Sequence, residues 1–180
     1  MGGSPRSQAP GRLEACVSDS QIPWPQYAKA LTDPDPAKPE ALSDLRVLDC
    51  SQGNFAALFC SSILAEFGAE VIRVEPSEGD VARLFTPQGF LHRGTGLGYL
   101  VEARNKRHIT LNLNAASGRE LFTRLARHMD VIIESARPGQ MDALGIGYRQ
   151  LSEVNPRLIY AAFSTYGQFG PKAATPIPDS

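Results

Sequence analysis

Short apolar runs that alternate with helical segments are the feature of this sequence that most restricts its fold. The runs lie at residues 45–49, 71–75, 109–113, 130–134 and 158–163, and each is rich in valine, isoleucine or leucine. Continuous apolar runs of this length, without an alternating polar face, are typical of strands that are buried on both faces of a sheet. Each run is therefore predicted to be a buried strand.

The segments between the runs carry the spacing of helices. From Phe55 to Phe67, apolar side chains recur at a period near 3.6 residues, and Gly68 follows at the position where a helix commonly ends. A second helix is predicted over 118–128, and short helical turns over 138–144 and 148–154. Strands that alternate with helices imply right-handed βαβ units. The predicted fold class is therefore α/β, a Rossmann-like layered domain with a mainly parallel sheet.

Proline separates the start of the chain from this domain. Half of the 14 prolines fall within residues 1–40, where they fix the backbone and remove hydrogen-bond donors. We predict a proline-rich, disordered arm over residues 1–41, and the alternative is an extended arm that docks through Trp24 and Tyr27. The layered domain is predicted over residues 42–180.

Composition excludes several classes of protein. The sequence has 18 basic and 19 acidic residues and a net charge of −1, so it offers no general attraction for nucleic acid or an anionic membrane. Cys16, Cys50 and Cys60 are odd in number and lack CxxC spacing, which argues against a disulfide framework or a zinc site. The histidines share no metal-ligand spacing, and no apolar run is long enough for a membrane span or a signal peptide. We expect a cytoplasmic protein without a metal site.

Ligands of open α/β sheets bind at the carboxyl ends of the strands, so the loops that follow these ends are the candidate site. The loop Cys50–Asn54 holds small polar residues before a helix; its backbone N–H groups could receive a phosphate or carbonyl, and a plain helix N-cap explains it equally. The stretch 103–108 gathers four potentially cationic side chains, as an anion site or as a solvated basic loop. Arg137 precedes a predicted helix that begins at Pro138, and it either holds a phosphate or pairs with Glu134.

Eight segments carry a further pattern. They are LSDLRVLD (42–49), LAEFGAEVIRVEP (64–76), EGD with Arg83 (78–83), RNKR (104–107), SARPG (135–139), LGIGY (144–148), NPRLIY (155–160) and YGQFGP (166–171). In this order and spacing, over about residues 42–180, they resemble the class III CoA-transferases of the carnitine and formyl-CoA type.

The resemblance implies an enzyme that moves CoA between carboxylic acids. An aspartate of the family attacks an acyl-CoA thioester and forms an aspartyl-CoA thioester. The implied partners are a CoA thioester and a carboxylic acid, CoA or acyl-CoA is a substrate rather than a tightly bound cofactor, and full-length members form interlocked dimers. The resemblance places the nucleophilic aspartate beyond Ser180, and Asp179 matches a different acidic position. We therefore expect a truncated chain that binds CoA without turnover.

The resemblance also assigns binding residues by position. Those at the thiol end of CoA are Gln52, Gly53, Asn54 and Phe55. Those that line the adenine and phosphate region are Leu111, Asn114, Ser135, Ala136 and Arg137, and those of its basic turn are Asn105, Lys106 and Arg107.

The sequence departs from the family at several of these positions. Phe55-Ala-Ala57 replaces Ala-Gly-Pro, Ser135-Ala136 replaces a pair with an aromatic residue, and Asn114 stands where some members carry lysine. The changes at Phe55-Ala-Ala57 and Ser135-Ala136 motivate one alternative, a non-catalytic subunit that supports an active partner. A racemase or lyase of the same family is a second alternative, and Pro178 argues against it because racemases carry a catalytic histidine there.

Overall fold

The computed structural model describes residues 40–173 and residue 175. Apart from Glu40 and Ala41, the predicted arm lies outside the described residues, and so do Pro178 and Asp179. The expectations for those residues stay predictions.

One parallel sheet forms the centre of the domain. Its strands are β1 (Arg46–Asp49), β2 (Glu70–Glu75), β5 (Lys106–Thr110), β6 (Val131–Glu134) and β7 (Ile159–Ala162). They are ordered β5-β2-β1-β6-β7, and every neighbouring pair is parallel. The predicted α/β class with a mainly parallel sheet is confirmed.

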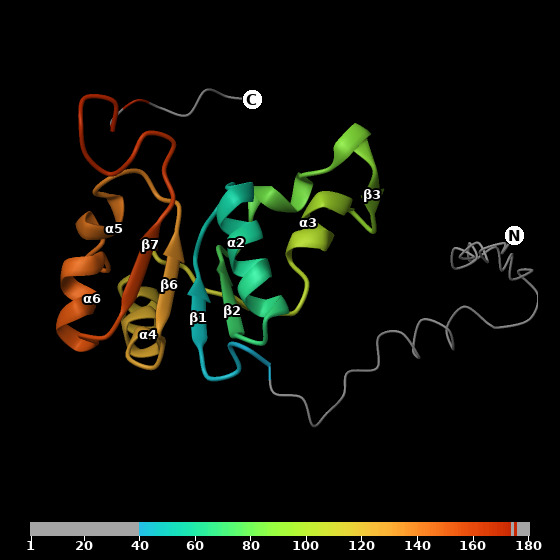
Figure 1. Cartoon of the computed structure of the whole chain (residues 1–180). Coiled ribbons are helices and arrows are strands. Elements are labelled where there is room, and N and C mark those ends of the chain that lie inside the picture. Colours follow the sequence, from blue (N-terminus) through green and yellow to red (C-terminus); the bar gives the residue numbers. More distant parts are fainter. Residues whose placement is uncertain (1–39, 174, 176–180) are drawn as a thin grey trace, which may run out of the picture. The chain divides into compact units, whose positions relative to one another are not determined.

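Helices cover both faces of this sheet. The connections use α2 (Phe55–Glu66) between β1 and β2, α4 (Ala116–Ala126) between β5 and β6, and α5 (Gln140–Ala143) with α6 (Tyr148–Val154) between β6 and β7. In Figure 1, α4 and α6 lie on one side of β1 and α2 lies on the other. Gly68 follows the end of α2 with a φ of 100°, which is the left-handed conformation predicted there.

Successive side chains of the strands point to opposite faces, as the pleat requires. Val47 packs with Val71 and with alanines of α2 in one core cluster. Leu48, the next residue of β1, packs with Phe122 of α4 and Leu151 of α6 in another. Both faces of the central strands are therefore buried, which explains why their sequences are continuously apolar.

The third strand begins earlier than predicted. The apolar run predicts it over 109–113, whereas β5 spans Lys106–Thr110 and includes part of the basic stretch. The charges are tolerated because each finds a partner on β2 or α2. Arg107 lies 2.8 Å from Glu70, and Lys106 donates to the Leu58 carbonyl on α2. Apolar periodicity cannot reveal a strand whose charges are neutralised by residues far away in sequence.

Two further segments differ from the prediction. The helix predicted over 138–144 is shorter, because Gly139 takes a left-handed φ of 80° and α5 begins only after it. The interval between β2 and β5, for which no element was predicted, holds 3-10 turns at Val81–Leu84 and Pro87–Gly89, a hairpin of β3 (Leu91–His92) and β4 (Thr95–Gly96), and α3 (Leu97–Glu102). Leu97, Leu100 and Val101 of α3 are exposed, so the helix lacks the clear apolar stripe that pattern analysis needs.

A cluster of buried charges lies beneath α2 and α3. Its centre is Arg73 of β2, whose side chain is 1% exposed and donates through Nη1 to Asp49 at 2.8 Å and through Nη2 to Asp80. Ser61 of α2 donates to the same Asp49 oxygen. The face of the sheet beneath α2 and α3 is therefore joined to these helices by hydrogen bonds as well as by apolar contact.

Glu75, at the end of β2, continues this cluster. It accepts two hydrogen bonds from Arg83, at 2.7 and 3.0 Å, and one from the Tyr99 hydroxyl, while His108 Nδ1 lies 2.8 Å away. Burial alone would raise the pKa of Glu75, but the hydrogen bonds from Arg83, Tyr99 and His108 lower it to about 2. The carboxylate is thus charged at every ordinary pH and holds α3 to the sheet.

No helix in the described part of the chain combines the length and the apolar character that a bilayer crossing requires.

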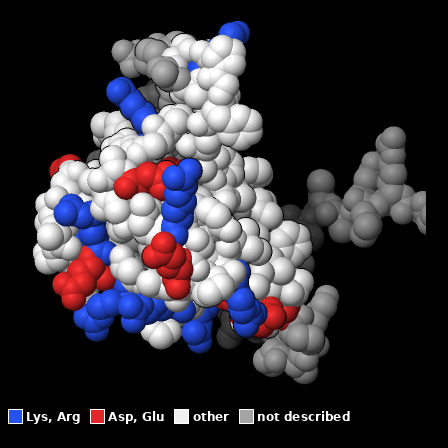
Figure 2. Space-filling view, turned by 90° about the vertical axis from the view of Figure 1, so that its left-hand side faces the viewer, with Lys and Arg blue, Asp and Glu red and all other residues white. Residues whose placement is uncertain are grey.

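Figure 2 shows acidic side chains lying among the basic ones on the face that α4 and α6 cover.

Lys106 provides a test of the buried cluster. Its side chain is fully buried and lies 3.7 Å from Asp49. Burial lowers the pKa of this amine from 10.5 to about 8, and the nearby Asp49 offsets only part of that effect. Between these values the unfolded chain binds more protons than the folded one, so the free energy of unfolding rises with pH across that window.

We expect Lys106→Met to remove this rise. From pH 7 to pH 9 the wild-type protein should gain about 1 kcal/mol of stability relative to the variant, measured by urea unfolding at both pH values. Titration of the buried Cys50 thiol also contributes to the pH dependence, but it contributes equally in both proteins and cancels in the difference between them. Parallel pH dependences would show that Lys106 titrates as a solvated amine.

Candidate functional site

The sheet order places a crevice between β1 and β6. The chain leaves β1 toward α2 on one face, and it leaves the neighbouring β6 toward α5 and α6 on the other. Loops that part in this way leave space at the carboxyl edge of the sheet, which is where open α/β sheets bind ligands.

A cavity of about 440 Å³ lies at this edge. It is lined by Cys50, Gln52, Pro76, Ser77, Glu78, Leu111, Asn112, Leu113, Asn114, Ser135, Ala136, Arg137, Gln140, Met141 and Leu144. Leucine, methionine and alanine side chains form an apolar part, and several amide groups surround it. Such a mixture suits a ligand with a flat apolar ring and a polar chain.

Six of the predicted binding residues meet in this cavity. They are Gln52, Leu111, Asn114, Ser135, Ala136 and Arg137, and they come from the loops after β1, β5 and β6. The structure therefore brings together the predicted adenine and phosphate residues with one residue of the predicted thiol-end loop.

The other residues of the thiol-end loop lie beside the cavity, at the start of α2. Asn54 is the N-cap of α2, and its side chain accepts from the Ala57 amide at 3.0 Å. The N-cap interpretation of this loop is thus confirmed. Phe55 is about half exposed, and its ring centre lies 6.2 Å from that of Phe85. Gly53 takes a left-handed φ of 57°.

Backbone N–H groups of this loop already have partners inside the protein. Ser51 donates to Asp49 at 3.0 Å, Gln52 donates to the Ser135 hydroxyl at 2.9 Å, and Gly53 donates to Asp80 at 2.8 Å. These three amides are therefore not free to receive a phosphate, and a ligand at this loop would meet side chains instead.

The predicted basic turn lies elsewhere. Asn105 and Lys106 stand at the amino end of β5, whereas the cavity lies beyond its carboxyl end. Asn105 donates to Glu66 at 3.0 Å, and Lys106 donates to Leu58 and Ser61 of α2. Arg107 is exposed and paired with Glu70. The structure gives these three residues partners within the fold and does not place them at the cavity.

Arg137 is the cation of this cavity. No ion pair forms between Arg137 and Glu134 in the described part of the chain; the Glu134 carboxylate instead accepts from the Ala136 amide. Among the described residues that line the cavity, Glu78 is the one acid, so the lining carries one charge of each sign.

The sequence prediction included the loop after β2 as part of the candidate site but named none of its lining residues, and it missed those that begin α5. Pro76, Ser77 and Glu78 follow the strand end at Glu75, and that position was a usable signal because it marks the carboxyl edge. Gln140 and Met141 had no such signal, since their approach depends on the turn at Gly139.

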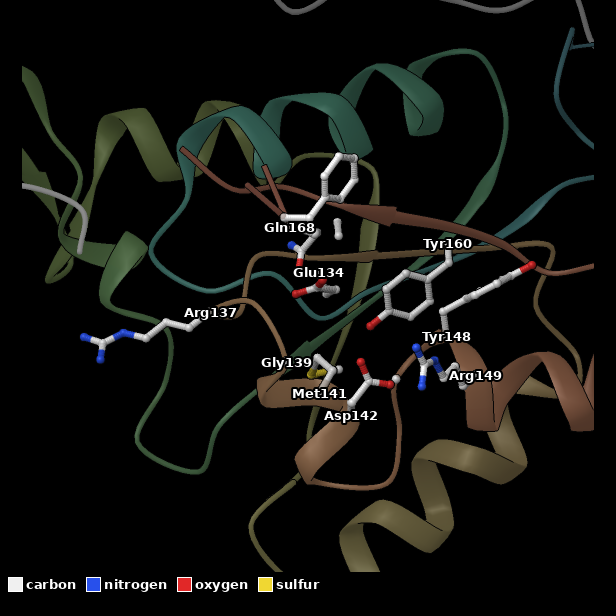
Figure 3. Close-up of a pocket in the computed structure, with 12 residues that line it drawn as sticks. Glu134, Arg137, Gly139, Met141, Asp142, Tyr148, Arg149, Tyr160 and Gln168 are labelled. Carbon is white, nitrogen blue, oxygen red and sulfur yellow. The ribbon is translucent and has the colours of Figure 1, made fainter. Parts of the chain in front are cut away.

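A second cavity, of about 500 Å³, lies on the other side of α5. Figure 3 shows Glu134, Asp142 and Tyr160 directed into it, while the side chain of Arg137, a residue that lines both cavities, extends away from them. Burial raises the pKa of Glu134, and the neighbouring Asp142 adds to this effect. The Tyr160 hydroxyl has no hydrogen-bond partner among the described residues, and burial raises its pKa as well.

Comparisons with known proteins agree with this geometry. The family model described as CoA-transferase family III matches residues 42–180. The beta subunit of succinyl-CoA–L-malate CoA-transferase from Chloroflexus aurantiacus is 46% identical over 132 residues, which are 72% of this chain and 32% of that protein. The acetyl-CoA:oxalate CoA-transferase of Acetobacter aceti is 38% identical over 152 residues, which cover 83% of this chain and 38% of the relative.

A solved structure of a related protein has the same fold. The crystal structure of a CaiB/BaiF family protein from Brucella suis superposes with a TM-score of 0.69 at 33% identity, covering 76% of this chain and 36% of that one. The chain spans about a third of the length of the relatives it matches. Sequence, sheet order and comparison therefore agree that this chain belongs to the CoA-transferase family III.

Proposed function

We propose that residues 42–180 bind CoA or acyl-CoA in the cavity at the carboxyl edge of the sheet. The observation that carries the proposal is the meeting of Gln52, Asn114, Ser135 and Arg137, from three separate loops, around one cavity. An apolar part formed by Leu111 and neighbouring residues suits the adenine ring, and the Arg137 guanidinium suits a phosphate.

The reaction proposed for the whole protein is the transfer of CoA between two carboxylic acids. Relatives that share this domain are named CoA-transferases, with succinyl-CoA and L-malate or acetyl-CoA and oxalate in their names. An aspartate that attacks the thioester would divide the exchange into two steps through an aspartyl-CoA thioester. Relatives are named as alpha and beta subunits, which supports an assembly of more than one chain.

The described residues are proposed to bind without performing this chemistry. Among the described residues that line the cavity, Glu78 carries the one side-chain carboxylate, and there is no aspartate. Asp49 and Asp80 are near but buried, and both are engaged by Arg73. Neither lines the cavity, and both oxygens of each accept hydrogen bonds within the protein, so neither is suited to attack a thioester.

The first test is the affinity of the chain for CoA, measured by isothermal titration calorimetry. We expect binding by the wild-type chain and about tenfold weaker binding by Arg137→Gln, because a charged hydrogen bond to phosphate is lost. Arg127→Gln is the matched control, since Arg127 is exposed at the end of α4 and lies outside the cavity. A folded wild-type chain that binds no CoA would refute the proposed function.

The second test adds a cation to the cavity. Asn114→Lys should tighten CoA binding by about threefold at low ionic strength, and the gain should shrink as salt is added. The control is His128→Lys, which adds the same charge at an exposed position beyond the other end of α4. If both variants tighten binding equally, the gain comes from net charge and not from the cavity.

The third test concerns turnover. With succinyl-CoA and L-malate as probe substrates, we expect this chain to form no malyl-CoA above the rate without protein, followed by liquid chromatography, although it binds CoA in the same buffer. Protein-dependent transfer that Glu78→Gln leaves intact would show that a nucleophile other than the cavity's carboxylate acts within these 180 residues.

A further inference from the structure

Two side chains from different loops hold the segment Ser51–Asn54 in place. On one side, the Ser135 hydroxyl accepts from the Gln52 amide at 2.9 Å and donates to the Gln52 carbonyl at 3.0 Å. On the other side, the Asp80 carboxylate accepts from the Gly53 amide at 2.8 Å. Adjacent peptide groups are therefore fixed from both directions, while the Gln52 side chain lines the cavity.

Asp80 is itself held firmly. Asp80 is 4% exposed, and its two carboxylate oxygens bind different partners. Oδ1 accepts from the Gly53 amide and from the Ala82 amide, at 2.8 and 2.9 Å, whereas Oδ2 pairs with Arg73. Arg73 is fixed in turn by Asp49 at 2.8 Å. The position of the Gly53 amide is thus connected to the central strands through ionic hydrogen bonds.

The conformation of Gly53 leaves little room for another arrangement. Its φ of 57° lies in the left-handed region, which glycine adopts without strain. A Cβ atom at this position would lie 3.0 Å from Cγ1 of Val81, the residue after Asp80. The loop after β1 and the turn that begins at Asp80 therefore pack closely where the hydrogen bond joins them.

We infer that Asp80 is a positioning residue for the ligand cavity, which holds the Gly53 amide and thereby directs the Gln52 side chain toward the bound molecule. This inference rests on the proposed function. Asp80 does not line the cavity, so it acts through the loop and not by contact with the ligand. The proposed ligand belongs to the acyl-CoA class, and Asp80 acts on the contact between this ligand and Gln52.

The test uses Asp80→Asn, which keeps the shape of the side chain. Asparagine has one acceptor oxygen, and this oxygen cannot serve both Arg73 and the Gly53 amide. We expect faster hydrogen exchange of the Gly53 amide, observed by NMR, and about a tenfold rise in the Kd for CoA, in line with the effects of other indirect supports of a site.

The matched control is Tyr99→Phe. It removes the hydrogen bond that the Tyr99 hydroxyl donates to Glu75 in the same buried cluster, and it does not alter the loop Ser51–Asn54. We therefore expect lower stability, with the Kd for CoA and the exchange rate of the Gly53 amide unchanged. Equal Kd values for wild type and a folded Asp80→Asn would overturn the inference. If Tyr99→Phe weakened CoA binding as much as Asp80→Asn does, the inference would also be overturned, because the weaker binding would then follow from lower stability.

A measurement on the wild-type protein keeps the inference testable if Asp80→Asn does not fold. The Gly53 amide should exchange far more slowly than that of Gly94, an exposed glycine in the turn between β3 and β4. Similar exchange rates would overturn the inference. Absence of CoA binding by the wild type would instead refute the proposed function, and the positioning role would fall with it.

Discussion

The ion pairs of Arg73 with Asp49 and Asp80 are the interaction on which the candidate site depends. Burying such charges is costly, and the cost is offset only where the remaining oxygens and protons find partners. Ser51 and Ser61 donate to Asp49, and the Gly53 and Ala82 amides donate to Asp80. The partners come from the loop after β1, from α2 and from the turn at Val81–Leu84, so the hydrogen bonds to the two carboxylates also fix the relative positions of these segments.

The two faces of the sheet therefore contribute differently. Under α4 and α6 the contacts are apolar, with Phe122 and Leu151 packed on Leu48 and Ile132. Under α2 and α3 charged and hydroxyl groups are paired with one another. Apolar contact stabilises the fold without fixing direction, whereas hydrogen bonds specify direction. The cavity lies at the edge where both faces meet, and its loops take their geometry from the polar one.

Sequence patterns predicted the fold better than the site. Strands such as β1 and β6 could be recognised because burial on both faces makes them continuously apolar, and Gly68 marked the end of α2 correctly. The start of β5 could not be recognised, since the charges of Lys106 and Arg107 are balanced by Asp49 and Glu70, more than thirty residues earlier. The family resemblance assigned Gln52 and Ser135 to the ligand site but could not show that the Gln52 backbone and the Ser135 hydroxyl bind each other.

The basic stretch at 104–107 shows why local charge is a weak guide to an anion site. Arg104 pairs with Glu66, Arg107 pairs with Glu70, and Lys106 is buried against α2, so these cations act within the fold. Arg137 is the cation that lines the cavity among the described residues, and Glu78 balances its charge there. Recognition of an anionic ligand by the described residues must then depend on the direction of a few groups rather than on a strong field. Direction is the property that the buried cluster of Arg73 and Asp80 controls.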